Sequence, residues 1–538
     1  MPDDLTATVT ATVRPVDESL SALAPLRHPV FRMLWITWMT ANTTMWMNDV
    51  AGAWLMTSLA PSPLWVALVQ SASTLPVFLL GLPSGALADI LDRRRYFMTT
   101  QFWVAGTSSI VCLTVFMGWM TAPLLLALTF ANGIGLAMRW PVFAAIVPEL
   151  VPRPQLPAAL ALNGVAMNTS RIIGPLVAGA IIAAAGSAWV FLLNACLSLV
   201  AGFVIMQWRR EHKENPLGRE RLGSAIRVGV QFVRQSGRMR AVLVRISLFF
   251  LHSTALLALL PLIARSLPGG QAGTFTVLLA SMGAGAIFAA LQMPLIRKLM
   301  PLQATIRLGT ALQAAAAVLV AFAPNIYVAV PGMLLAGVAW ISVANSLTVA
   351  AQMALPDWVR ARGMSIYQMA LMGSSASGAA LWGLVATWTN IHDSVAIAAV
   401  SSVCLMLIAQ RLVTDRGIEE DLTPSRVLKL PKAAAPPQAQ RIQVNIEYRV
   451  DPARAAEFLQ LMQESRRSRI SQGAIDWQVL QDLYDPGRIV EQVTDMSWTE
   501  HLRRFDRVTA ADVQLRDRKL AFHIAEHPPV VTRFVIEG

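Results

Sequence analysis

The stretch "SGALADILDRRRYF", residues 84–97, decides how this sequence is interpreted. An apolar run reaches Asp89, and three arginines follow at positions 93–95. On both sides lie apolar runs of about 20 residues, the length of a helix that crosses a bilayer. The stretch is therefore predicted to be a short charged connection between two membrane helices. Lysine and arginine concentrate on the cytoplasmic side of membranes, so this connection is expected to be cytoplasmic.

The composition of the whole chain indicates a membrane protein. Of 538 residues, 55% are hydrophobic and 14% are charged, against about 25% charged in soluble domains. The net charge of +12 does not indicate nucleic-acid binding, because the arginines lie between apolar runs. The three cysteines also lie inside apolar runs, with no CxxC pair, so neither a disulfide framework nor a metal site is predicted. No cofactor is expected.

Apolar runs of spanning length occur twelve times along the chain. They are residues 31–58, 63–88, 97–119, 122–147, 157–184, 187–207, 240–264, 272–296, 306–323, 326–354, 364–388 and 393–412. Basic residues cluster in the connections after even-numbered runs, whereas "APSP", "GWMTAP" and "AAGSA" carry no charge. This asymmetry predicts a multi-pass protein of the inner (plasma) membrane with both termini in the cytoplasm. Residues 1–28 are expected to be a cytosolic tail and not a signal peptide.

The runs divide into two groups of six. Residues 29–207 and 240–415 are the predicted six-helix bundles, and the polar, basic segment 208–239 is the predicted cytoplasmic loop between them. A weak internal sequence similarity relates the two halves. "PELVPR" at 148–153 joins the fourth and fifth runs, and "PDWVRAR" at 356–362 joins the tenth and eleventh. Paired halves with a substrate path between them are typical of secondary transporters.

The connection at 84–97 resembles the loop signature of the major facilitator superfamily. Gly85, Asp89, Arg93 and Arg94 match that signature, whereas Ile90 and Asp92 depart from it. The resemblance implies a breakable latch between the halves. In it, Asp89 faces the positive N-terminus of a neighbouring helix, and the arginines hold acidic or carbonyl partners. The alternative is that the arginines only anchor the loop to anionic headgroups and set the topology.

Longer stretches resemble one branch of that superfamily, the bacterial drug and siderophore exporters, which include enterobactin-type exporters and macrolide efflux proteins. They are "WMNDVAGAWLMTSLAPSPLWVALVQSASTLPVFLLGLPSGALAD", "PELVPRPQLPAALALNGVAMNTSRIIGPLVAG" and "QMALPDWVRARGMSIYQMALMG". The resemblance covers about residues 25–415. It implies proton-driven export of small amphipathic molecules, with protons, a small-molecule substrate and the lipid bilayer as partners.

Few charges lie deep in the predicted spans. They are candidates for function, because each costs about 2.5–3.5 kcal/mol to insert. Asp49 is the only deep carboxylate, and in a low-dielectric site it could take up and release a proton near neutral pH. Arg171 differs from it in depth by about 6 Å at 1.5 Å per residue, so Arg171 is expected to reach Asp49. Arg139 lies nearer the cytoplasm. The alternative to proton coupling is a static buried ion pair.

Other polar and aromatic residues in the spans could line a wet substrate cavity. They are Asn42, Trp46, Gln70, Asn163, His252 and Trp340. Each of them alone is more often an interhelical hydrogen-bonding or packing residue, and for His252 a packing role is the favoured alternative.

The composition changes near residue 415. Residues 416–440 form a Pro/Ala-rich linker, and residues 441–538 follow a βαββαβ pattern that predicts a cytosolic ferredoxin-like domain. This part resembles the antibiotic-biosynthesis monooxygenase-like proteins, with Trp498 and His501 in matching places. The resemblance implies self-association through the sheet. A dimerising, sensing or stabilising role is expected, and no catalytic residue is identified.

The sequence thus predicts an all-α membrane protein with twelve helices in two six-helix bundles, plus a C-terminal α+β domain. The predicted function is export by proton antiport and alternating access, not enzymatic catalysis. The alternative is a membrane-anchored oxygenase-like enzyme, or a sensor, acting through the C-terminal domain.

Overall fold

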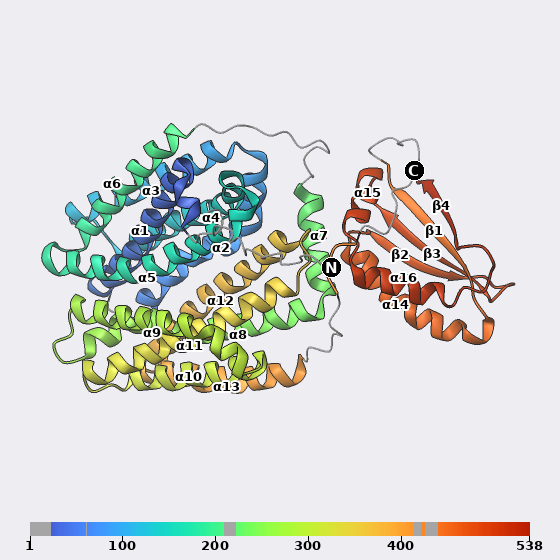
Figure 1. Ribbon diagram of the computed structural model, residues 1–538. Coiled ribbons are helices and arrows are strands. Elements are labelled where there is room, and N and C mark those ends of the chain that lie inside the picture. Colours follow the sequence, from blue (N-terminus) through green and yellow to red (C-terminus); the bar gives the residue numbers. More distant parts are fainter. Residues whose placement is uncertain (1–22, 61, 209–221, 414–420, 426–439, 538) are drawn as a thin grey trace, which may run out of the picture.

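The computed structural model describes residues 23–60, 62–208, 222–413, 421–425 and 440–537. Figure 1 shows a large helical body and a small sheet-containing domain beside it. Most of the predicted linker and of the N-terminal tail lies outside the described residues.

Long helices occupy all the predicted spans. The first group is α1 (Pro29–Leu59), α2 (Pro63–Ile90), α3 (Arg93–Phe116), α4 (Ala122–Leu150), α5 (Leu156–Ala185) and α6 (Ser187–Gln207). The second group is α8 (Gly237–Ser266), α9 (Ala272–Leu299), α10 (Leu302–Ala321), α11 (Ile326–Met353), α12 (Arg360–Trp388) and α13 (Ile391–Leu412). Short 3-10 turns, η2 (Ala24–Arg27) and η3 (Arg153–Gln155), precede α1 and α5.

Eleven helices in the described part of the chain are long and apolar enough to cross a membrane, one fewer than expected. The exception is α1, whose apolar character is diluted by threonines, asparagines, Arg32 and Asp49. This helix nevertheless packs against α5 and α6 within the first group.

Local sequence explains where the helices begin and end. Asn325 and Asn390 lie just before α11 and α13, and their side chains accept backbone N–H groups at 3.2 and 2.8 Å. Such caps satisfy donors that a helix start leaves unpaired. Gly186 ends α5 with φ of +96°, a conformation that other residues rarely adopt. The turn between α5 and α6 therefore needs no extra residues.

The segment expected to be a plain cytoplasmic loop contains a further helix, α7 (Leu222–Gln235). It packs against α8 and α12 on one side and against α14 of the C-terminal domain on the other. Gln231 Nε2 donates to Ala474 O at 3.3 Å. Trp358, in the connection before α12, lies between Phe232 of α7 and the guanidinium of Arg507, with ring-centre distances of 5.7 and 5.4 Å. The C-terminal domain is therefore docked on α7 and Trp358.

The C-terminal domain has the predicted order of strands and helices. Its elements are β1 (Ile442–Arg449), α14 (Ala455–Ser471), β2 (Asp476–Gln481), β3 (Arg488–Asp495), α15 (Trp498–Asp506), α16 (Ala510–Leu520) and β4 (Val530–Val535), with a 3-10 turn, η4 (Pro452–Arg454), before α14. The strands form one antiparallel sheet in the order β2-β3-β1-β4. Two helices, α15 and α16, lie between β3 and β4, and Thr509 caps the start of α16.

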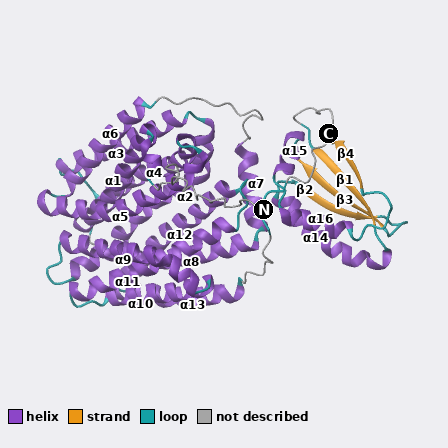
Figure 2. Cartoon of the chain, in the orientation of Figure 1, coloured by secondary structure: helices purple, strands orange, loops and turns teal. Residues whose placement is uncertain are grey.

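One face of this sheet carries the domain's core. Figure 2 shows the strands with helices against them. In β3, Ile489 and Val493 are buried and pair with Tyr448 and Val444 of β1. The same alternation also turns Glu491 and Asp495 inward, and both are fully buried. Two acids inside an apolar core require bonded partners.

Candidate functional site

The two six-helix groups meet along α2 and α12, α5 and α9, and the pair α1/α2 with α8. Ser71 Oγ of α2 donates to Ala376 O of α12 at 2.7 Å. At the end of the interface remote from the C-terminal domain, Arg265 of α8 donates to Thr57 O of α1, and its guanidinium lies 5.5 Å from the ring centre of Trp54. The halves are in close contact at this remote end.

A glycine allows α2 and α12 to approach closely there. A Cβ added at Gly383 would lie 2.6 Å from Ala67 Cβ and 3.2 Å from Leu64 Cα. We expect Gly383→Leu to hold this end apart and to slow transport. A cysteine placed at the buried Ser71, in a background without the native cysteines, should then react faster with a small thiol reagent.

The matched control for this variant is Gly106→Leu on α3, where an added Cβ has nothing within 4 Å. It should leave the Ser71→Cys reactivity unchanged. Equal reactivity in both variants would show that contact at Gly383 does not keep the halves together.

Asp49 lies at the interface between the halves. It lines a small pocket of about 20 Å³, together with Gln70 and Ser73 of α2 and Leu257 and Ala258 of α8. A pocket of this size holds about one water molecule. No ion-pair partner for Asp49 occurs in the described part of the chain. The structure thus places Asp49 and Gln70 together, with a wall contributed by the second half.

Arg171 does not reach Asp49, contrary to expectation. Its guanidinium lies 3.6 Å from the ring centre of Trp340 on α11 and 5.6 Å from that of Trp46 on α1. Cation–π contacts of this kind contribute about 0.5–2 kcal/mol each. Arg171 Nη2 and Trp340 Nε1 are buried with no hydrogen-bond partner among the described residues. Three predicted site residues therefore meet across the two halves as a stack.

Arg139 and Asn42 lie inside the first half. Arg139 Nη1 donates to Ala41 O at 3.1 Å, and its guanidinium is 5.5 Å from the ring centre of Trp38. Asn42 Nδ2 donates to Trp38 O at 2.8 Å within α1. Both side chains donate to backbone carbonyl groups of α1, and neither contacts the Asp49 side chain in the described part of the chain. Asn163 Oδ1 is buried and has no hydrogen-bond partner among the described residues.

His252 lies in α8, within the second half. Its Nδ1 is 2.6 Å from Leu248 O, one turn earlier in the same helix, and its ring packs 5.6 Å from that of Trp382. This environment fits the packing alternative. The structure does not bring His252 to the Asp49 pocket.

The residues of the predicted latch are placed only in part. Gly85 and Asp89 belong to α2, but their side chains lie outside what the structure describes. Arg94 donates to Met206 O at the end of α6, which is in the same half and not across the interface. Asp92, a departure from the family signature, caps α3 by accepting Arg95 N–H at 2.9 Å. This capping role could have been predicted from the sequence, since aspartate is favoured just before a helix.

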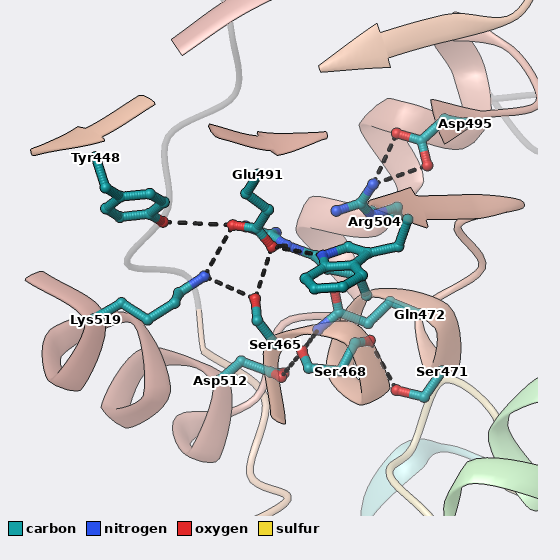
Figure 3. A network of polar contacts seen from close by, with 12 residues as sticks. Tyr448, Ser465, Ser468, Ser471, Gln472, Glu491, Asp495, Arg504, Asp512 and Lys519 are labelled. Carbon is teal, nitrogen blue, oxygen red and sulfur yellow. Dashed lines mark hydrogen bonds and ion pairs between the residues drawn. The ribbon is translucent and has the colours of Figure 1, made fainter. Parts of the chain in front are cut away.

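The C-terminal domain holds a buried polar network (Figure 3). The Glu491 carboxylate accepts hydrogen bonds from five side chains: Ser465 at 2.7 Å, Trp477 at 3.1 Å, Lys519 at 3.1 Å, Arg469 at 3.3 Å and Tyr448 at 3.4 Å. A second buried carboxylate, Asp495, binds Arg504 Nη1 and His501 Nδ1, both at 2.8 Å. Each buried acid thus has at least one cationic partner: Arg469 and Lys519 for Glu491, and Arg504 for Asp495.

These pairings decide the charge states in the network. Burial would raise the pKa of Glu491, but Arg469 and Lys519 outweigh it and hold that pKa well below the usual value. Burial would likewise raise the pKa of Asp495, and Arg504 with His501 holds it low. Burial lowers the pKa of Lys519 to about 8, although Glu491 opposes the change. At neutral pH both carboxylates are ionised.

Comparison with known proteins then assigns the chain. A family model described as transmembrane secretion effector matches residues 20–538, the membrane helices and the C-terminal domain together. The chain belongs to this family, which is part of the major facilitator transporters. The protein is a multi-pass membrane transporter, and its two helix groups are the paired halves of that superfamily.

Curated relatives of this chain include a siderophore transporter and a macrolide efflux protein. The staphyloferrin A transporter of Staphylococcus aureus is 22% identical over 367 residues, 68% of this chain and 91% of that protein. Macrolide efflux protein A of Streptococcus pyogenes is 24% identical over 176 residues, 32% of this chain and 42% of that protein. Relatives of the siderophore and macrolide classes named in the sequence analysis are therefore found among curated proteins.

Solved structures show the same fold. A POT family transporter in complex with 5-aminolevulinic acid has a TM-score of 0.59 at 12% identity, over 72% of this chain and 97% of that one. A bacterial homologue of the human lysosomal transporter Spinster, in an inward-facing conformation, has a TM-score of 0.57 at 12% identity, over 72% and 96%. At such identity the likeness concerns the fold alone. The resemblance of the C-terminal domain to monooxygenase-like proteins stays a prediction.

The sequence analysis did not predict the buried polar network of the C-terminal domain. The signal was present in "RIVEQVTD", residues 488–495, where Glu491 and Asp495 alternate in step with Ile489 and Val493. Acids at the inward positions of an alternating strand predict buried carboxylates. Their cationic partners lie on α14, α15 and α16, which strand periodicity does not reveal.

Proposed function

We propose that this protein exports small amphipathic molecules of the drug, macrolide or siderophore class by proton antiport and alternating access. The observation that carries the proposal is the position of Asp49. This carboxylate lies in a pocket whose wall comes from both halves. A proton taken up there changes the charge of the surface where the halves separate. Protonation and the change of access are thereby coupled at one residue.

The Arg171 stack supports the same proposal. Arg171 and Trp46 belong to the first half and Trp340 to the second, so the stack must separate if α5 moves away from α11. A delocalised guanidinium between two indole rings also suits flat, partly aromatic cargo. We therefore propose Trp46 and Trp340 as cargo-contacting residues and Arg171 as the cation that cargo displaces or joins.

We further propose that α1 also crosses the membrane, which brings the number of spans to twelve, and that both termini are cytoplasmic. In this orientation α7, Trp358 and the C-terminal domain lie in the cytoplasm. The distribution of basic residues between the connections supports it. A plasma-membrane location in the cell fits the same arrangement.

Transport by inverted membrane vesicles tests the proposed function. A pH gradient with an acidic interior should drive accumulation of a macrolide or a siderophore from a panel of compounds, and a protonophore should abolish it. Vesicles without the protein provide the baseline. Absence of gradient-driven accumulation for every compound, from protein shown to be folded, contradicts the proposal.

The proposed latch comes from the sequence resemblance and centres on Asp89, which lies at the cytoplasmic end of α2 in the proposed orientation. A partly buried, charge-assisted contact is worth about 1.5–3 kcal/mol. We expect Asp89→Asn to leave expression normal, to slow turnover, and to shift the population toward the inward-facing state by about tenfold to a hundredfold. Cysteine labelling from the cytoplasmic side measures this shift. Arg95→Ala is the control for topology alone, and equal behaviour of the two variants would leave only a topology signal.

A further inference from the structure

The C-terminal domain has an open cavity between its sheet and its helices, with Arg516, Val531 and Arg533 at its exposed side. The cavity has a volume of about 500 Å³, within the range of small-molecule sites. Its floor is apolar and comes from three strands: Val444 and Ile446 of β1, Val493 of β3 and Val531 of β4. Phe505 and Leu515, from the helical side, also line it. Such a shape accepts a flat apolar body.

Cationic side chains outnumber carboxylates around this cavity. Five cationic side chains line it: Arg469, Arg504, Arg516, Lys519 and Arg533. The carboxylates at or behind its wall are Asp512, Glu491 and Asp495. Lys519 and Arg469 share Glu491, and Arg504 binds Asp495. Within the described residues no carboxylate pairs with Arg516 or Arg533.

Arg533 is positioned by a hydrogen-bonded chain through His501 to Asp495, and its two Nη groups remain available as donors. Its Nε donates to His501 Nε2 at 3.2 Å, and His501 Nδ1 lies 2.8 Å from Asp495 Oδ2. Because a guanidinium only donates, His501 Nε2 must accept, and its proton then resides on Nδ1. The two Nη groups of Arg533 make no hydrogen bond among the described residues. A positioned guanidinium with free Nη groups matches the geometry of a carboxylate.

We propose that this cavity is a binding site for a small amphipathic carboxylate. The apolar body lies on the sheet floor, and the acid group binds the Nη donors of Arg533, with Arg516 as the second cation. The cavity also has a direct link to the docking surface. Gln472 lines the cavity, and its carbonyl oxygen accepts Arg507 Nη1 at 2.7 Å, while Arg507 itself contacts Trp358.

Binding is measured on the full-length protein in lipid nanodiscs by isothermal titration calorimetry. The probes are 2-naphthoate, indole-3-acetate and the neutral 2-naphthamide. We expect the parent protein to bind at least one carboxylate at least about tenfold more tightly than the amide. Arg533→Gln should lose about tenfold to a hundredfold in affinity for that carboxylate, and Arg533→Lys less. Arg516→Gln should lose affinity as well.

The control is Arg518→Gln, two residues from Arg516 on the same helix, where Arg518 pairs with the exposed Glu464. It should bind like the parent. Three results overturn the proposal: no binding of either carboxylate, equal affinity for acid and amide, or unchanged affinity in Arg533→Gln. The last would place the ligand elsewhere, for example in the transport pathway. Since the measurement involves no pH gradient, its failure leaves the proposed transport function standing.

Discussion

Replacing Asp49 with asparagine should abolish uphill transport. The side chain keeps nearly the same volume beside Gln70 and Ser73, so the fold and cargo binding should persist. What is lost is a group that titrates where the halves meet. With a gradient of two pH units and one proton per cargo molecule, the parent can accumulate cargo about a hundredfold, since each unit is worth about 1.36 kcal/mol. The variant should only equilibrate it.

Proteoliposomes containing purified protein provide the measurement. Cargo accumulation under the gradient is compared with cargo exchange in its absence, which should continue in Asp49→Asn. Asp393→Asn is the control, because Asp393 is an acid in the first turn of α13, bonded to the capping residue Asn390. Accumulation by Asp49→Asn equal to that of the parent would exclude Asp49 as the coupling residue.

Replacing Glu491 with glutamine should destabilise the C-terminal domain by about 3–5 kcal/mol, the cost of leaving buried cations unpaired. Lys519 Nζ and Arg469 Nε lose their shared carboxylate at 3.1 and 3.3 Å. Unfolding of the domain within the full-length protein can be followed by pulse proteolysis. Glu464→Gln removes the exposed ion pair with Arg518 and should cost no more than about 1 kcal/mol.

The effect of Glu491 also has a definite pH dependence. The pKa of Glu491 is depressed in the folded domain. Its contribution to stability is therefore complete above the unfolded pKa of about 4.3 and is lost as the pH falls toward the lower folded value. The difference between the parent and Glu491→Gln should shrink below about pH 4. A difference that stays constant from pH 7 to pH 3 would show that the pairing is not the cause.

Much of the fold follows from local sequence. Apolar runs of spanning length predicted the helices, and residues such as Asn325, Asn390 and Gly186 mark their ends. The βαββαβ pattern of residues 441–538 predicted all four strands, β1 to β4. The helix α7 was missed because its polar residues resemble a loop until α12 and α14 are present to cover its apolar side. Burial of an amphipathic helix depends on partners distant in the sequence.

The sequence predicted which residues of the candidate site lie deep in the membrane, but not which of them contact one another. Counting residues gives the depth of a side chain in the membrane but not the direction in which it points around its helix. Arg171 and Asp49 have similar depths, yet Arg171 lies against Trp340, which is 169 positions later in the sequence. Gln70, which the sequence analysis named as a substrate-cavity residue, lines the small pocket of Asp49. The contact between Asp49's pocket and α8 depends on how the halves meet, which no local pattern encodes.

The position of α7 makes the C-terminal domain a participant in the energetics of the transport cycle. The helix belongs to the chain segment that joins the two halves, and it contacts both α12 and α14. A rearrangement that alters the packing of α12 on α7 alters the surface on which α14 rests. By thermodynamic reciprocity, the domain then favours one arrangement of the halves by the amount by which that arrangement favours docking. The C-terminal domain thereby biases the equilibrium between the arrangements of the two halves through its contact with α7.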